Sequence, residues 1–302
     1  TRVVFRTGPL FAEPNKETPA DQYFDMPRAD ESDPMATFSI ANVKTYAADA
    51  DGQAAVLKFD DYKHYVDYFN NMEDENIANA IPNSQSAEWM SKNVPLFDCP
   101  QDNFREMYYY RWWTLRKHIK RTPVGYGMTE FLVQRSYADR YNLIACAIGH
   151  HVMETRWLRD TTYINQILNT WYHGNDGKAM QKMEKFSSWN PAAVYEAYKV
   201  NGNRSFIDSL KPSLEEEYAR WQKTHRLDNG LYWQEDVRDG MEESASGGRK
   251  KKFARPTINS YMYGNAMALA EMNKLAGDEA KVRKYTDEAS QLKTLVENKL
   301  WN

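Results

Sequence analysis

Cysteine is scarce in this chain of 302 residues, which contains only Cys99 and Cys146. Two cysteines cannot form the disulfide framework of a small secreted domain, and they lack the spacing of a metal-binding motif. Whether they pair with each other stays open at this stage. The adjacent histidines His150 and His151 do not have the i, i+3 or i+4 spacing that two ligands on one helix require. We therefore expect no metal site.

Long apolar runs and an excess of charge are also missing. No run approaches the roughly 20 residues of a membrane-spanning helix, and the net charge is −3. No general field would attract nucleic acid or acidic lipid, so we expect neither as a partner. The sequence contains no Gly-x-Ser-x-Gly, P-loop or Gly-x-Gly-x-x-Gly motif. We expect no organic cofactor.

Aromatic residues, in contrast, are abundant, with 9 Trp and 20 Tyr. Aromatic rings fill large cores and also form the platforms on which sugars stack. The length suits two or three average domains, or one small domain with part of a larger one. Either use of the aromatic residues fits such a chain.

Residues 1–98 read as a short β-rich segment followed by a linker helix. Strands are expected at 2–6, 36–40 and 54–59, and a helix at 60–69, where apolar residues recur at helical spacing. From residue 99 onward the pattern is helical. Helices are expected at 104–118, 141–158, 160–172, 191–200, 205–224, 257–275 and 278–300.

The connections between these helices alternate in length, which predicts helical hairpins. Short turns lie at 200–204 and 275–278, whereas long loops span 174–189 and 227–256. Residues capable of chemistry gather in the long loops, so we expect function on that side.

One segment of the second long loop, residues 233–244, is rich in carboxylates and begins with a tryptophan. Glycoside hydrolysis requires an acid that protonates the leaving oxygen and an aromatic ring that receives the sugar. The alternative is a solvated acidic loop. The carboxylates are Glu235, Asp236, Asp239, Glu242 and Glu243.

Three segments resemble trehalase-like and glucosidase-I-like hydrolases. They are Asp-Gly-Met-Glu-Glu-Ser at 239–244, Thr-Ile-Asn-Ser-Tyr-Met-Tyr at 257–263, and the helix end Leu-Ala-Gly-Asp at 275–278. The resemblance covers roughly residues 100–302. It implies a mainly α fold, the N-terminal part of an (α/α)6 toroid, and hydrolysis with inversion. By this resemblance the toroid domain, residues 99–302, continues beyond residue 302.

A narrower resemblance lies in the segments at 108–113, 149–151 and 154–160. They are similar to the mannosylglycerate-hydrolase-like domain of polysaccharide-degrading gut bacteria. That group is associated with glycoside hydrolase family 142, whose activity is β-L-arabinofuranosidase. The implied protein is periplasmic or extracellular and releases terminal sugars from oligosaccharides of plant or host polysaccharides.

The resemblance also implies catalytic roles. The family's general acid is an aspartate, and the aligned residue here is Glu242. Glu243 follows directly, and Asp239 replaces a family serine, so the acid remains open among these three. The family's catalytic base lies in the second half of the toroid, which implies that the remainder of the polypeptide supplies it. Glu154 is the candidate within this chain.

Substrate-binding residues are expected around the same loops. By resemblance, Arg156, Trp157 and Asp160 line the subsite of the cleaved sugar, and the alternative is an ordinary Arg–Asp pair. Trp189 is either a sugar platform or a hydrophobic staple. The remaining candidates adjoin the acidic loop or begin the following helix, and the alternative role of Asn259 is to cap the turn. They are Trp233, Gln234, Asn259 and Tyr261.

Two other functional classes stay open. A non-catalytic carbohydrate-binding toroid would keep the aromatic platforms without needing an acid. A polysaccharide lyase or epimerase would need a histidine or tyrosine base beside an arginine, for which His150, His151 and Arg156 are the candidates.

Overall fold

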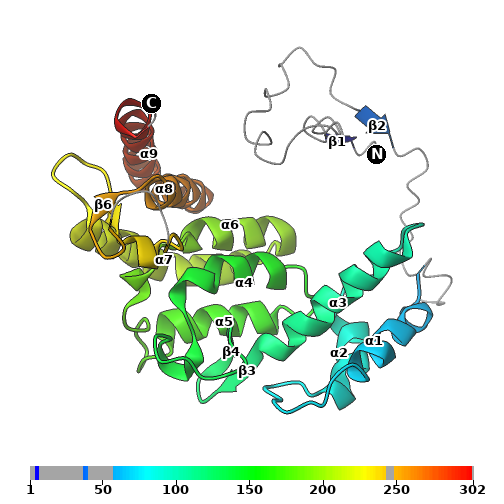
Figure 1. Ribbon diagram of the computed structural model, residues 1–302. Helices are drawn as coiled ribbons and strands as arrows, with labels where there is room; N and C mark the ends of the chain where they lie inside the picture. The colour runs from blue at the N-terminus through cyan, green and yellow to red at the C-terminus, as the bar shows by residue number, and fades with distance from the viewer. Residues whose placement is uncertain (1–3, 7–36, 40–56, 243–247, 301–302) are drawn as a thin grey trace, which may run out of the picture. The chain divides into compact units, whose positions relative to one another are not determined.

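The computed structural model describes residues 4–6, 37–39, 57–242 and 248–300 (Figure 1). The chain forms two compact units, Thr1–Val56 and Leu57–Asn302. In the first, β1 (Val4–Arg6) pairs antiparallel with β2 (Thr37–Ser39), which confirms two expected strands. The third, at 54–59, lies partly outside the described residues. Its end was wrongly predicted, because Phe59 begins the 3₁₀ turn η2 (Phe59–Asp61).

The second unit begins well before residue 99. Helices α1 (Lys63–Asn70) and α2 (Ser86–Asn93) pack against α3 (Asp102–His118). Tyr62 stacks on Tyr109 with ring centroids 4.8 Å apart. The expected linker helix is therefore a packed part of the helical unit, and the unit boundary lies at residue 57. Helix α2 was missed from the sequence.

A buried cation fixes this first group of helices. Arg116 of α3 is fully buried and donates hydrogen bonds to the Ile81 carbonyl and, at 2.7 Å, to Oδ1 of Asn83. Burial lowers the pKa of Arg116 to about 10. Because an unpaired buried charge is costly, these bonds tie the loop before α2 to α3.

Helix α3 buries only one of its faces, although it carries aromatic residues on several. Tyr109 and Trp113 lie in the core, whereas Phe104, Met107 and Tyr110 are exposed.

The segment after α3 forms a hairpin that the sequence reading did not predict. Strand β3 (Ile119–Thr122) pairs antiparallel with β4 (Gly125–Met128). The turn contains Gly125 at φ 130°, a conformation that favours glycine. The Thr122 hydroxyl donates to the Gly125 carbonyl at 2.7 Å.

The helix expected at 141–158 is much shorter, because α4 spans Ile148–Thr155. The cause is Asn142, which has a left-handed backbone with φ 62°. Its buried amide donates to the carbonyls of Phe131 and Val133 and accepts from the Arg135 amide. These side-chain bonds replace the helical pattern locally.

The other five helices agree with the expected ranges. Local residues mark the ends of α8, with Pro256 in its first turn and the left-handed Gly277 directly after it. The side chain of Asp278 caps α9. The helices are α5 (Thr162–His173), α6 (Asn190–Asn201), α7 (Arg204–His225), α8 (Pro256–Ala276) and α9 (Glu279–Lys299).

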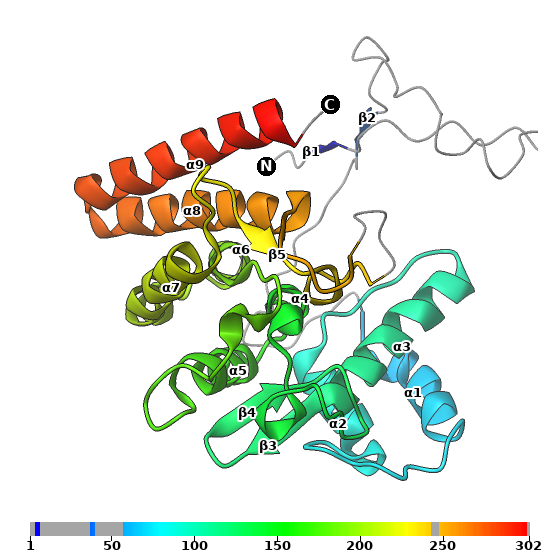
Figure 2. The same ribbon diagram turned by 60° about the vertical axis from the view of Figure 1, so that its left-hand side comes forward.

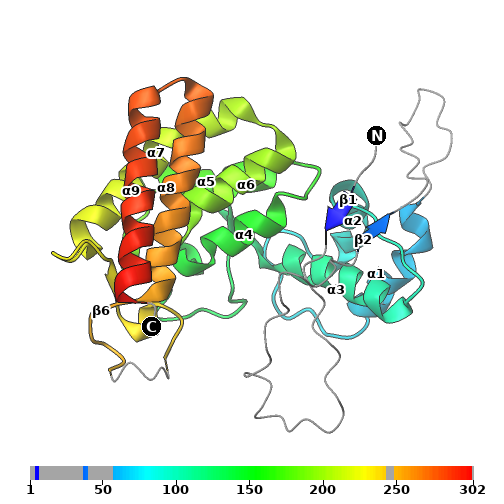
Figure 3. The same cartoon turned by 90° about the horizontal axis from the view of Figure 1, so that it is seen from above.

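These helices alternate between two layers. Helix α6 contacts both α4 and α8 in one layer, and α7 packs across α5, α6 and α8. Figures 2 and 3 show α8 and α9 side by side as an antiparallel hairpin. The mainly α fold class is confirmed. A two-layer order of this kind is expected in an (α/α)6 toroid, whose complete ring stays a prediction. Of the described helices, none is long and apolar enough to cross a membrane.

A buried carboxyl group joins three of these helices. Glu217 of α7 accepts hydrogen bonds from the Tyr172 hydroxyl of α5 and from Nδ2 of Asn190 in α6, the latter at 2.8 Å. Burial raises the pKa of Glu217 to about 7. The native state therefore binds a proton on Glu217 that the unfolded chain has released above its ordinary pKa of 4.5.

This raised pKa predicts that stability falls as pH rises. The contribution of Glu217 is fully present below pH 4.5 and is lost as pH passes about 7, a change on the order of 3 kcal/mol. We expect the melting temperature to decrease between pH 5 and 8 more steeply in the wild type than in Glu217→Gln. Thermal unfolding at several pH values measures this difference. Parallel curves for the two proteins would contradict the assignment.

Candidate functional site

A pocket of about 750 Å³ lies where the long loops meet the ends of α4 and α8. The loops 130–137, 185–187 and 237–242 contribute to its lining, together with Arg249 and residues of the segment leading into α4. The lining includes side chains that can react or bind a ligand, and most of these are charged or aromatic. The full set of such side chains is Glu130, Cys146, His150, Lys185, Ser187, Arg238, Asp239, Glu242, Arg249 and Tyr261.

Hydrogen bonds join the two long loops at this pocket. This agrees with the prediction that both loops lie on the same side of the helical hairpins. The Ser187 amide donates to the Arg238 carbonyl at 3.0 Å. The Ser187 hydroxyl donates to the Asp239 carboxylate. One wall of the pocket is thus formed by both loops acting together.

A buried cluster of charges holds the carboxylate-rich loop. Arg255, directly before α8, donates from Nε to Asp239 Oδ2 at 3.1 Å and from Nη1 to Asp236. The side chains of Arg255, Asp236 and Asp239 are 8%, 1% and 0% exposed. Because burial of charges is costly without close partners, this arrangement specifies one position for the loop.

The loop then turns at Gly240, which has φ 72° and permits a left-handed backbone. The Asp236 carbonyl accepts from the amides of Asp239 and Met241, both at 3.0 Å. After this turn the side chain of Glu242 is exposed and lines the pocket. Glu243 lies outside the described residues.

Three further groups of the pocket have raised pKa values. Partial desolvation raises the pKa of Glu130, although its side chain reaches solvent, and the nearby His150 opposes the shift. Burial raises the pKa of Tyr261, and the charge of Asp239 adds to it. Burial also raises the pKa of Cys146 to about 12, so its thiol stays protonated and is a poor nucleophile.

Several pocket residues were missed or misplaced in the sequence analysis. Cys146 lines the pocket, and both cysteines are free thiols. Arg249 belongs to a basic run with no predicted role. Glu130 follows β4 without any recognisable pattern, and only the fold brings it here. His150 lines the pocket whereas His151 is buried.

Trp189 packs against two side chains that line the pocket, His150 and Tyr261. Its ring lies edge-on to His150, with centroids 5.5 Å apart, and 6.3 Å from the ring of Tyr261. A Cβ atom added at Gly149 would lie 2.5 Å from the Trp189 ring. Trp189 therefore packs tightly on α4 and positions two lining side chains.

Two predicted binding residues instead support the loop. Gln234 is fully buried, on the short strand β5 (Trp233–Gln234), which pairs with β6 (Phe253–Ala254). Asn259 is also fully buried, and its amide bonds to the Tyr232 backbone NH and carbonyl, both at 2.8 Å. Neither side chain reaches the pocket in this conformation.

Trp233 is half-buried beside the same loop. Its ring stacks on His225 with centroids 4.4 Å apart, and the Lys252 ammonium lies 4.1 Å from its centroid. Of the eleven predicted site residues, the pocket lining thus includes Asp239, Glu242 and Tyr261.

Arg156, Trp157 and Asp160 lie at the other end of α4. The Arg156 guanidinium lies 5.0 Å from the Trp157 ring centroid. Asp160 accepts a hydrogen bond from the Thr162 amide at 2.9 Å, at the start of α5. Trp157 lines a different pocket, which it shares with Glu154. The structure therefore separates this predicted group from the carboxylate-rich loop.

Comparisons with known proteins agree with the resemblance found in the sequence. The family model described as the mannosylglycerate hydrolase MGH1-like glycoside hydrolase domain matches residues 140–302. A solved structure named "Sialidase" is 62% identical, with a TM-score of 0.81. The match covers 98% of this chain and 27% of that chain, so this chain spans about a quarter of that protein. The family match includes the loops and helices that form the pocket, except the loop 130–137. The chain belongs to the MGH1-like glycoside hydrolase domain family.

Proposed function

We propose that the protein is a glycosidase that cleaves terminal sugars in the pocket lined by Glu242, with Glu242 as the general acid. The observation that carries the proposal is the way the loop presents this side chain. The buried cluster of Arg255, Asp236 and Asp239 fixes the loop, and the turn at Gly240 leaves the Glu242 carboxyl exposed in the pocket. A general acid needs this combination of fixed position and access to the leaving oxygen.

The geometry favours Glu242 over Asp239 as the acid. Asp239 accepts hydrogen bonds from Ser187 and Arg255 and has a fully buried side chain. Its carboxylate is already engaged, so its role is to hold the loop. Glu242 also occupies the position that aligns with the acid of the family, with glutamate in place of aspartate.

Other side chains of the pocket suit recognition of a sugar. Glu130, His150 and Lys185 provide donors and acceptors for hydroxyl groups, and Tyr261 provides a ring beside the loop. We propose hydrolysis with inversion, for which the second carboxylate comes from the remainder of the polypeptide. Glu154 is a poor alternative base, because it pairs with Arg111 and lines the other pocket.

The proposed substrates are oligosaccharides from plant or host polysaccharides, and β-L-arabinofuranosides are the first class to test. Sialosides belong in the same panel because of the similar protein's name. A periplasmic or extracellular location suits such substrates. The lyase or epimerase alternative needs another arginine than Arg156, which does not line the pocket of His150, whereas Arg238 and Arg249 do. An unsaturated product that absorbs in the near ultraviolet would favour this alternative over hydrolysis.

The role of Glu242 predicts a dependence on the leaving group. In the intact polypeptide, Glu242→Gln should reduce kcat/KM by about 10²-fold or more for oligosaccharides, whose leaving alkoxide needs a proton. The loss should be much smaller for a dinitrophenyl glycoside of the same sugar, whose leaving group departs without protonation.

Steady-state kinetics on both substrates measure this difference, with Glu216→Gln, an exposed carboxylate on α7, as the control. Equal losses on both substrates would contradict the acid role of Glu242. Binding of oligosaccharides by a wild type without turnover would instead favour the non-catalytic alternative.

The role of Asp239 predicts an effect on stability. Asp239→Asn leaves the buried Arg255 guanidinium with one charged partner fewer, and we expect a loss of about 3 kcal/mol in unfolding free energy. Asp208→Asn breaks an exposed ion pair with Arg204 and should cost less than about 1 kcal/mol. Urea unfolding compares the two variants. Similar small losses would show that the cluster does not hold the loop.

A further inference from the structure

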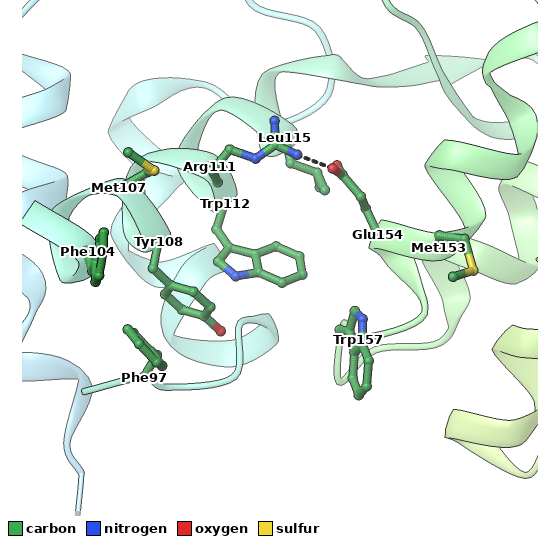
Figure 4. A pocket seen from close by; sticks show the side chains of 10 residues that line it. All are labelled: Phe97, Phe104, Met107, Tyr108, Arg111, Trp112, Leu115, Met153, Glu154 and Trp157. Carbon is green, nitrogen blue, oxygen red and sulfur yellow. Dashed lines mark hydrogen bonds and ion pairs between the residues drawn. The ribbon is translucent and has the colours of Figure 1, made fainter. Parts of the chain in front are cut away.

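A second pocket, of about 460 Å³, lies between α3 and the end of α4 (Figure 4). Aromatic side chains dominate its lining. Tyr108 and Trp112 project from α3, and Trp157 faces them from beyond the end of α4. The function proposed above does not use this pocket.

The aromatic face of α3 is unusually open to solvent. Phe104, Tyr108 and Trp112 recur at four-residue intervals, so they lie along one side of the helix. Phe104 is 52% exposed, and Trp157 across the pocket is 48% exposed. Rings that stay this exposed add little to the core, and their faces are available to a ligand.

Charged groups stand at the rim of the same pocket. Arg111 of α3 pairs with Glu154 of α4, and both side chains remain well exposed. Figure 4 shows this ion pair spanning the gap between the two helices beside Trp112. A ligand here would meet flat apolar rings together with both donors and acceptors.

Helix α4 connects this pocket with the one that contains Glu242. His150, Met153 and Glu154 are spaced i, i+3 and i+4 on α4, the spacing of one helical face, and Trp157 follows two residues after the helix ends. His150 lines the first pocket, whereas Met153, Glu154 and Trp157 line the second. The four residues from His150 to Glu154 rise by roughly 6 Å along the helix. A chain of a few sugars is long enough to reach from one pocket to the other.

We infer that the aromatic pocket is a second carbohydrate subsite, which holds a further sugar of the oligosaccharide whose terminal linkage lies at Glu242. Sugar rings have apolar faces that stack on Trp and Tyr, and hydroxyl groups that bond to the Arg111–Glu154 pair. A polypeptide segment covering the pocket would use the rings but not require the exposed charged pair. The inference rests on the proposed function for the identity of the first subsite.

The test compares a short and a long substrate in the intact polypeptide. Trp157→Ala should lower kcat/KM about 10-fold for an oligosaccharide, mainly through KM, because stacking binds a remote sugar. It should leave kcat/KM unchanged for the p-nitrophenyl glycoside of the same terminal sugar. Trp157→Phe should keep most of the activity on the oligosaccharide. Tyr68→Ala, which removes an exposed ring on α1, is the matched control.

Equal losses on both substrates, or none on the oligosaccharide, would overturn the inference and leave the proposed function standing. If the wild type turns over no glycoside, binding to an array of plant and animal oligosaccharides tests whether the second subsite exists. Binding that Trp157→Ala weakens supports the second subsite without hydrolysis, and binding that it leaves unchanged, or no binding, overturns it. Loss of folding in Trp157→Ala, with Tyr68→Ala folded, would show that polypeptide covers the pocket and would also overturn it.

Discussion

The buried contact of Arg255 with Asp236 and Asp239 is the constraint on which the candidate site depends. It joins the start of α8 to the carboxylate-rich loop, and Ser187 extends the connection to the second long loop. Three charged side chains can stay buried together only when their geometry is well satisfied. The loop that presents Glu242 therefore has one preferred position, and the proposed hydrolysis requires such a position of its general acid.

Helix α4 contributes side chains to both pockets. Helix α4 is held on one side by Trp189, which packs on Gly149, and its exposed face passes from the Glu242 pocket to the aromatic pocket. In the proposed function, rigid helices place the side chains that recognise the sugars, and loops tied down by buried charges place the general acid. Such a division suits an enzyme that must hold a chain of sugars while it acts at one linkage.

Much of the helical framework could be predicted from the sequence, because Pro256, Gly277 and Asp278 mark helix ends by local chemistry. The meeting of the two long loops also followed from their lengths. The left-handed backbone at Asn142 could not be predicted from the sequence, since it depends on hydrogen bonds to Phe131 and Val133 that exist only after folding. Within the site, Glu130 carries no local signal. Asn259 and Gln234 have the right chemistry for a sugar ligand, yet their burial is decided by packing that no local pattern reveals.

The most direct test of the account is a crystal structure of the intact polypeptide carrying Glu242→Gln, with an uncleaved oligosaccharide bound. The account predicts that the terminal sugar occupies the 750 Å³ pocket. The glycosidic oxygen should lie within hydrogen-bond distance, about 2.6–3.2 Å, of the substituted side chain. A terminal sugar bound elsewhere, or a glycosidic oxygen beyond the reach of residue 242, would contradict the account.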